Sequence, residues 1–220
     1  MGVAWVFEIE QGSNQPSAKE VKSSFFTFFF SFFAFQIERT LEAGGAETVG
    51  TYLVDCIPYT PREKMTSNVN YIMHHSNFPQ STFSIAPGDK TNFKEMARAI
   101  CDKGFDLIIK NMSSGFEPDN AAKFAISGTE YRFNDFSVRV GSALQVSTFK
   151  GVVVEVEYEP LFVTTQALMM LNDFMKHFFS KHMNSKPDVL EDKPKPETYS
   201  PMDTMYQYLK IFNAMRKRAN

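Results

Sequence analysis

Cysteine is scarce in this chain, and so is any excess of charge of one sign. Two cysteines, Cys56 and Cys101, occur among 220 residues, which is too few for a disulfide framework and favours reduced thiols in a cytosolic or nuclear compartment. The net charge is −2, and the one basic cluster is Arg216, Lys217 and Arg218. The composition therefore shows no electrostatic footprint for nucleic-acid binding and indicates an ordinary globular protein with a hydrophobic core.

Motifs typical of common catalytic sites are also missing. The chain contains neither a GxGxxG nor a GxxxxGKS/T phosphate loop, and it has no GxSxG nucleophile elbow. His74 and His75 are adjacent, so their rings point to opposite faces of a strand and cannot share a metal. His177 and His182 are five residues apart, which is out of register for a helical zinc pair. We therefore expect neither a metal nor another cofactor.

The most regular pattern in the chain is the alternation in residues 151–160, GVVVEVEYEP. One face of this stretch carries Val152, Val154, Val156 and Tyr158, and the other carries Val153, Glu155, Glu157 and Glu159. A period of two between a glycine and a proline predicts a half-buried β-strand whose apolar face lies in the core.

The acidic face of this strand has two interpretations. In a triphosphate-tunnel enzyme, carboxylates such as Glu155, Glu157 and Glu159 would hold divalent cations inside a barrel. Such a tunnel also needs rows of Lys and Arg to neutralise phosphates, but the neighbouring predicted strand offers only Arg132 and Arg139, on opposite faces. We favour a solvated or partner-facing edge of a scaffold and keep the metal-dependent phosphohydrolase as the alternative.

An anomalous tract over residues 21–36, VKSSFFTFFFSFFAFQ, holds eight of the 23 phenylalanines. It is shorter than the roughly 20 apolar residues of a transmembrane helix, no signal-peptide cleavage site follows it, and it lacks the single apolar face of a buried helix. Read as DNA, it can begin GTAAA, continue through a pyrimidine-rich run and end TTTCAG, and its sixteen codons keep the frame. We therefore interpret the tract as a retained intron. Without it, residues 17–20 and 37–46 join into a short amphipathic helix with Ile37 and Leu41 on one face.

The remaining pattern consists mainly of strands with short connections, which imply an antiparallel meander. Strands are expected over residues 3–9, 48–57, 68–75, 81–86, 122–126, 130–141, 143–149 and 151–160, with turns in the last part of this series at residues 127–128, 141–142 and 150–151. Several antiparallel neighbours of this kind favour a curled or barrel-like sheet.

Three helices complete the expected fold. The first is capped by Thr91 or Asn92 and has an apolar stripe of Phe93, Met96, Ala97 and Ile100; the second covers residues 165–182, and the third begins at Ser200, Pro201, Met202 and Asp203. Residues 183–199 are rich in proline and charge and are expected to form an exposed flexible loop. The fold class is therefore α+β: one domain over residues 1–220, with an antiparallel, barrel-like sheet, flanking helices and two C-terminal helices.

Several motifs occur together in a recognisable order. They are MGV at residues 1–3, VDC at 54–56, YIMHHSNFP at 71–79, TNF at 91–93, GTEYRFNDFSVRVG at 128–141, GVVVEVEYEP at 151–160 and YSPMDTMYQYLKIFNAMRK at 199–217. In this order the chain resembles the family of Mediator complex subunit 20, a component of the Mediator head module. The tract at residues 21–36 has no counterpart in the family pattern, and removing it restores the family spacing between the first strand and VDC.

The resemblance implies a non-enzymatic component of the RNA polymerase II coactivator Mediator, which regulates transcription in the nucleus as a scaffold with a β-barrel-like fold. It also implies pairing with subunit 18 and tethering through subunit 8, without direct contact to nucleic acid or membrane. The family-motif residues that we select as candidates for the partner surface are Tyr131, Asp135, Phe136, Glu155, Glu157, Tyr158, Asp203, Gln207, Tyr208 and Phe212.

Overall fold

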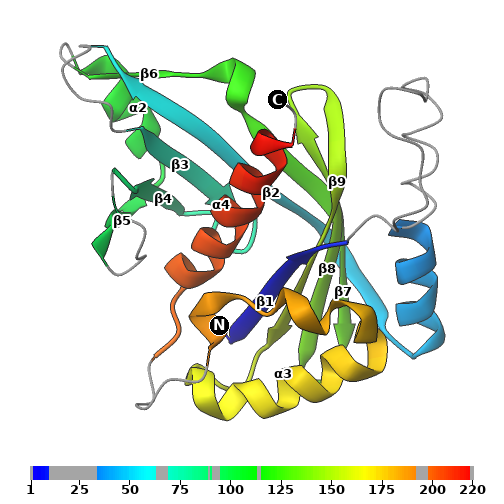
Figure 1. Cartoon of the computed structure of the whole chain (residues 1–220). Coiled ribbons are helices and arrows are strands. Elements are labelled where there is room, and N and C mark those ends of the chain that lie inside the picture. The colour runs from blue at the N-terminus through cyan, green and yellow to red at the C-terminus, as the bar shows by residue number, and fades with distance from the viewer. Residues whose placement is uncertain are drawn as a thin grey trace. The chain divides into compact units, whose positions relative to one another are not determined.

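The computed structural model describes residues 2–9, 34–62, 69–88, 90, 95–112, 115–191 and 198–218. The chain divides into two compact units. Unit 1 comprises Met1–Thr51, Ser127–Ala143 and Phe149–Asn220, and unit 2 comprises Tyr52–Ile126 and Leu144–Thr148. The predicted α+β class is confirmed, because the strands whose register is known pair antiparallel and the last strand is followed by α-helices at the C-terminal end (Figure 1).

Unit 1 is built on four strands in the order β1-β9-β8-β7. These strands are β1 (Val3–Glu8), β9 (Thr148–Tyr158), β8 (Phe136–Gln145) and β7 (Phe124–Phe133). The helical elements of the unit are a helix over residues 34–43, α3 (Thr164–Phe178), η3 (Ser180–Ser185), η4 (Asp188–Leu190) and α4 (Pro201–Lys217). β1 runs antiparallel to β9 with Val3 opposite Tyr158, so the start of the chain lies beside the strand that the sequence marks most clearly.

Strand β9 is buried on both faces. Val152, Val154 and Val156 lie in the main apolar core of unit 1, to which α3 contributes Leu168 and Leu171. Helix α4 packs along β1, and its side chains reach the opposite, acidic face of β9. The alternation therefore predicted the strand and its core-facing set correctly, and the tertiary structure covers the second face as well.

The start of α4 follows the sequence signal closely. Pro201 occupies the first turn, and Ser200 and Asp203 form a reciprocal capping box. This arrangement satisfies main-chain N–H groups at the helix start that have no acceptor within the helix. The predicted start of the last helix is confirmed.

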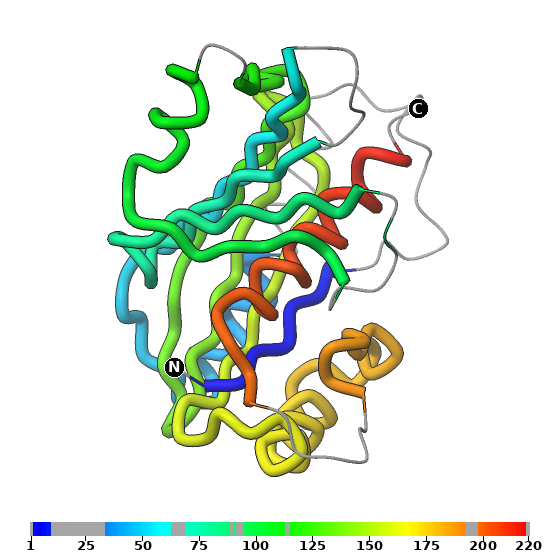
Figure 2. The backbone as a smooth tube through the Cα atoms, turned by 90° about the vertical axis from the view of Figure 1, so that its left-hand side faces the viewer, coloured from blue at the N-terminus to red at the C-terminus, as the bar shows by residue number. Residues whose placement is uncertain are grey.

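Unit 2 holds four strands in the order β2-β3-β4-β5, with β6 paired to β2. The strands are β2 (Glu47–Pro61), β3 (Asn70–His75), β4 (Ser81–Ala86), β5 (Ala97–Asp102) and β6 (Phe116–Pro118). Strands β3, β4 and β5 run side by side in both views (Figures 1 and 2). The helical elements α2 (Phe105–Asn111) and η2 (Asn120–Ala122) follow, and Ile109 of α2 packs on Tyr59 and Ile72.

The helix predicted after residue 91 is wrong where the structure describes it. Ala97 and Ile100, which were assigned to its apolar stripe, lie in β5, where Ile100 is opposite Phe83 of β4. Pairing with β4 overrides a short helical periodicity, since residue preferences of this size yield to tertiary contacts. The proposed cap residue Asn92 lies outside the described residues.

The turns of the β7-β8-β9 series were also predicted at the wrong places. The chain reverses near Asn134 and Val146, both of which have positive φ, at 52° and 56°. Gly128 and Gly141 instead lie within strands β7 and β8, and a Cβ on Gly128 would meet the carbonyl oxygen of Val140 at 1.9 Å. These two glycines therefore allow two backbones to approach each other, which a sequence pattern does not distinguish from a turn.

The two unusual segments are described only in part. Residues 21–33 of the phenylalanine-rich tract lie outside the described residues, and residues 34–36 begin the helix that carries Ile37 and Leu41 toward the core. The retained intron stays a prediction. The connector expected as an exposed loop over residues 183–199 contains η4, whose Leu190 is fully buried, so this part is anchored. Within the described residues, no helix has both the length and the apolar character needed to span a membrane.

Candidate functional site

The acidic face of β9 does not point to solvent as expected. Glu155 is 2% exposed and Glu157 is 9% exposed, so of the predicted solvated or partner-facing edge the solvated alternative is wrong for both. Glu159, at the end of the row, is partly exposed; it accepts a hydrogen bond of 2.6 Å from the Ser137 hydroxyl and pairs with Arg132 at 3.3 Å. The three glutamates therefore occupy different environments, and the first two need a buried counter-charge.

Arg139 of β8 supplies that counter-charge. Its side chain is 2% exposed and donates to Glu130 at 2.7 Å, to Glu157 at 2.9 Å and to Glu155. Burial by itself lowers the pKa of Arg139, but attraction to Glu155, Glu157 and Glu130 raises it well above its usual value. Arg139 is consequently a permanent cation, and we call these four residues the charge cluster.

The chain start and α4 complete the charge cluster. The Gly2 main-chain N–H donates to Glu157 Oε1 at 2.7 Å, and the Tyr208 hydroxyl donates to Glu155 Oε2 at 2.5 Å. Gly2 lies so close to the end of β9 that an added Cβ would be 1.8 Å from the carbonyl oxygen of Tyr158. The cluster and these two partners therefore join β7, β8, β9, α4 and the residue before β1.

Gln207 connects α4 to the outer edge of β1. Its Oε1 accepts from the Val6 N–H at 2.8 Å, and its Nε2 donates to the Ala4 carbonyl at 3.0 Å and to the Tyr199 hydroxyl at 2.7 Å. The carboxamide thus offers one acceptor and one donor to β1, as a neighbouring strand would. Full burial raises the pKa of Tyr199 well above its usual value, which keeps this hydroxyl protonated. Edge strands are commonly protected in some such way, and here α4 provides the protection.

The other predicted site residues divide among separate environments. Phe136 lies in the apolar core. Its ring stacks on that of Phe174 of α3 with the ring centroids 4.4 Å apart, and its centroid lies 5.0 Å from that of Tyr158. Phe212 is buried 6.2 Å from the ring of Tyr208. The ten candidates therefore do not form one surface patch: Glu155 and Glu157 belong to the charge cluster and Tyr208 bonds to it, whereas Gln207 bonds the edge of β1.

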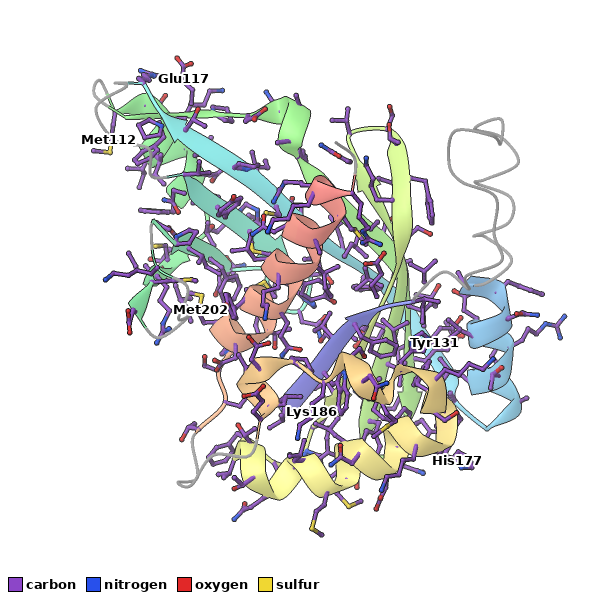
Figure 3. The ribbon with its side chains drawn as sticks, in the orientation of Figure 1. Met112, Glu117, Tyr131, His177, Lys186 and Met202 are labelled. Carbon is purple, nitrogen blue, oxygen red and sulfur yellow. The ribbon has the colours of Figure 1, made fainter. Side chains whose placement is uncertain are left out.

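Tyr131 is buried in the core of unit 1, whereas the two aspartates lie at a helix start and in a turn. Tyr131 faces the helix over residues 34–43 (Figure 3), and burial together with the Glu38 carboxylate raises its pKa to about 12. Asp203 belongs to the capping box of α4, and Asp135 lies exposed in the β7-β8 turn. Arg139, Gly2 and Tyr199 were missed as site residues. A signal for Arg139 exists in FSVRV, since an arginine within an apolar strand requires buried acceptors.

The charge cluster is arranged to hold elements together and does not favour a triphosphate tunnel. The carboxylate oxygens of Glu155 and Glu157 accept hydrogen bonds from Arg139, Tyr208 and Gly2, and α4 lies over them. A tunnel would instead direct several cations from neighbouring strands toward an open interior. Among the described residues, no group of three or more His, Cys, Asp or Glu side chains is placed to hold a metal ion.

Comparison with known proteins gives consistent matches along the chain. Residues 33–213 match the family model described as "TATA-binding related factor (TRF) of subunit 20 of Mediator complex". The "Mediator of RNA polymerase II transcription subunit 20" of Caenorhabditis briggsae is 45% identical, over 99% of this chain and 100% of its own length. The Homo sapiens protein of the same name is 32% identical, over 83% of this chain and 85% of its own. Among solved structures, the PH1012 protein of Pyrococcus horikoshii OT3 overlaps with a TM-score of 0.43 at 13% identity, covering 81% and 90% of the two chains, which is too distant to bear on function.

Proposed function

The chain belongs to the family of Mediator complex subunit 20, and on this premise we propose that it works as a non-enzymatic scaffold subunit of the Mediator coactivator, helping to regulate transcription by RNA polymerase II. The observation that carries this proposal is that the most distinctive motif residues form contacts within the fold. Glu155, Glu157, Gln207 and Tyr208 are buried and bonded to other parts of the same fold. Such residues preserve the shape of a module that neighbouring subunits recognise.

The partners within Mediator belong to the same proposal. We assign the protein to the head module in the nucleus, paired with subunit 18 and tethered through subunit 8. Apolar side chains on the surface support a role in assembly: Phe162, Met169 and Met170 are exposed in unit 1, and Leu107 and Ile108 are exposed in unit 2. Methionine and aromatic side chains are enriched in protein interfaces, where they adapt to a partner and exclude water.

The candidate partner residues act in two ways in this proposal. Asp135 is exposed and Asp203 is half-buried, so a neighbouring subunit can touch them directly. The buried candidates hold the strands and α4 in place beneath the surface. Replacing a buried member is then expected to weaken assembly through the fold, whereas replacing Asp135 is expected to weaken a contact without changing stability.

Co-purification tests the proposal directly. We expect the tagged full chain, expressed in cells, to be recovered from the nuclear fraction with Mediator subunits, including subunits 18 and 8, identified by mass spectrometry. The protein recovered by this route is also assayed for release of phosphate from inorganic tripolyphosphate with Mg²⁺ or Mn²⁺. A free monomer with metal-dependent triphosphatase activity would contradict the scaffold function and support the tunnel alternative.

A further inference from the structure

The outer edge of β5 carries main-chain N–H and C=O groups that point away from β4, as in an edge strand that can pair with a further strand. β5 is the last strand in the order of unit 2, and no strand of the described residues pairs with its outer side. The Lys103 N–H donates to the Gln80 carbonyl at 2.9 Å, which fixes the alternation of this antiparallel pair. The main chains of Ala99 and Cys101 accordingly face β4, and those of Ile100 and Asp102 point outward.

The side chains along this edge add chemical character. Ile100 is 52% exposed, although it lies opposite Phe83 of β4, which is fully buried. Asp102 and Lys103 are exposed at the end of the strand, and β5 contains no proline or bulge that would prevent pairing. Natural edge strands usually carry some such obstacle, or are covered, because an open edge pairs readily with another chain.

The opposite end of the strand order shows how this fold covers an edge. In β1 the bond from the Ile9 N–H to the Val152 carbonyl fixes the same alternation, so the main chains of Ala4 and Val6 point outward. Gln207 bonds both of them. Within the described residues, no side chain is seen to bond the outward main-chain groups of Ile100 as Gln207 bonds those of β1. The edge of β5 therefore differs from the edge of β1.

We propose that the edge of β5 binds an extended segment of a neighbouring protein subunit, which adds to the sheet as an antiparallel strand. The segment carries an aliphatic side chain opposite Ile100 and a lysine or arginine opposite Asp102, so that both the apolar surface and the charge are matched. Antiparallel addition continues the pairing of β3, β4 and β5. This inference rests on the proposed function, because it requires that the chain works within an assembly.

A subunit segment fits this edge better than a second copy of the chain. A six-residue strand pairing with its own copy buries much less than the about 1,200 Å² of a stable specific interface. A segment that belongs to a subunit held in the same complex has a high local concentration and needs less contact area. The short edge is therefore suited to a secondary contact within an assembly.

A proline substitution tests the edge with a matched control. Ile100→Pro removes the outward N–H and places a ring on the edge, while the bonds of Ala99 and Cys101 to β4 remain. Ile100→Thr keeps the N–H and strand preference. The tagged full chain, wild type or variant, is used to capture Mediator subunits. We expect the recovery of at least one neighbouring subunit to fall about tenfold with Ile100→Pro and to stay near the wild-type level with Ile100→Thr.

Hydrogen exchange provides a second measurement that does not depend on a variant. The peptide covering residues 97–102 is expected to exchange more slowly in Mediator than in the isolated chain, because the amides of Ile100 and Asp102 acquire acceptors. Unchanged exchange in this peptide, or normal recovery of a folded Ile100→Pro protein, overturns the inference while leaving the proposed function intact. Dimerisation of the isolated chain that Ile100→Pro abolishes would show that the occupant is a second copy instead. Failure of the wild-type chain to co-purify with Mediator refutes the proposed function itself.

Discussion

Replacing Arg139 by methionine should destabilise the protein more than any other substitution of a cation in unit 1. Methionine keeps much of the length of the side chain but removes the guanidinium that faces Glu155, Glu157 and Glu130. The first two carboxylates are almost completely buried, so water does not replace the lost partner. The substitution therefore leaves negative charge in the interior without compensation.

The size of the effect follows from this burial. Breaking a buried ion pair from one side costs about 3–5 kcal/mol, because the remaining charge stays desolvated. For a chain of this length, each kcal/mol lowers the melting temperature by about 2–4 °C, so Arg139→Met is expected to lower it by about 6–20 °C. Tyr208→Phe removes a single hydrogen bond to Glu155 and should cost less, about 1–3 kcal/mol.

Arg132 provides the control for this experiment. It lies on the adjacent strand and pairs with Glu159, but its side chain is 56% exposed, so Arg132→Met is expected to cost about 0–1 kcal/mol. Thermal and urea unfolding, followed by circular dichroism, measure both variants. Adding Glu155→Gln and Glu157→Gln to Arg139→Met should recover part of the lost stability, since the uncompensated charges disappear. Equal stability of Arg139→Met and Arg132→Met would refute the role assigned to the charge cluster.

Other predictions concern single contacts. Gln207→Leu leaves two main-chain groups of β1 without their side-chain partner and should cost about 1–3 kcal/mol per group in urea unfolding, and Gln207→Glu, which retains the acceptor but buries a carboxylate against the Ala4 carbonyl, should cost at least as much. Gly128→Ala should destabilise strongly because its Cβ would overlap the backbone of β8. Gly50→Ala should be close to neutral, since no atom of the described residues lies within 4 Å of an added Cβ; similar melting temperatures for the two variants would contradict this. A hydrogen bond to an aspartate of β2 raises the pKa of His74, so its stabilisation is complete below the unfolded pKa of about 6.5 and disappears as the pH rises through the folded pKa. The stability of His74→Gln should consequently lack this decline with pH. Genomic DNA and a spliced transcript read across residues 21–36 should show GT and AG at the two boundaries; their absence would refute the intron.

Sequence patterns predicted much of the local structure correctly. The alternation around Val154 predicted β9 and its core-facing residues, because a strand with one apolar face has a period of two. The sequence of β4 predicted its bounds, residues 81–86, without error. Ser200 and Asp203 predicted the start of α4, because a capping box depends on residues only three positions apart. Each of these features is decided by near neighbours in the chain.

The sequence did not predict β5 as a strand, and it did not predict the turns near Asn134 and Val146. β5 has a composition that also suits a helix, and its pairing with β4 decided the outcome. Gly128 resembles a turn residue in sequence, but its role is to allow a close approach to β8. In both cases the deciding contact is made with another strand, so local propensity alone does not predict it.

The family, the α+β class and the strand that carries Glu155 and Glu157 follow from the amino-acid sequence. The role of those glutamates follows from contacts that form only in the folded chain. Their environment depends on Arg139 from the neighbouring strand, on Gly2 at the chain start and on Tyr208 from the last helix. A period of two shows that two faces differ, but the burial of the polar face depends on a helix about fifty residues away, and a pairing over that distance leaves no periodic signal.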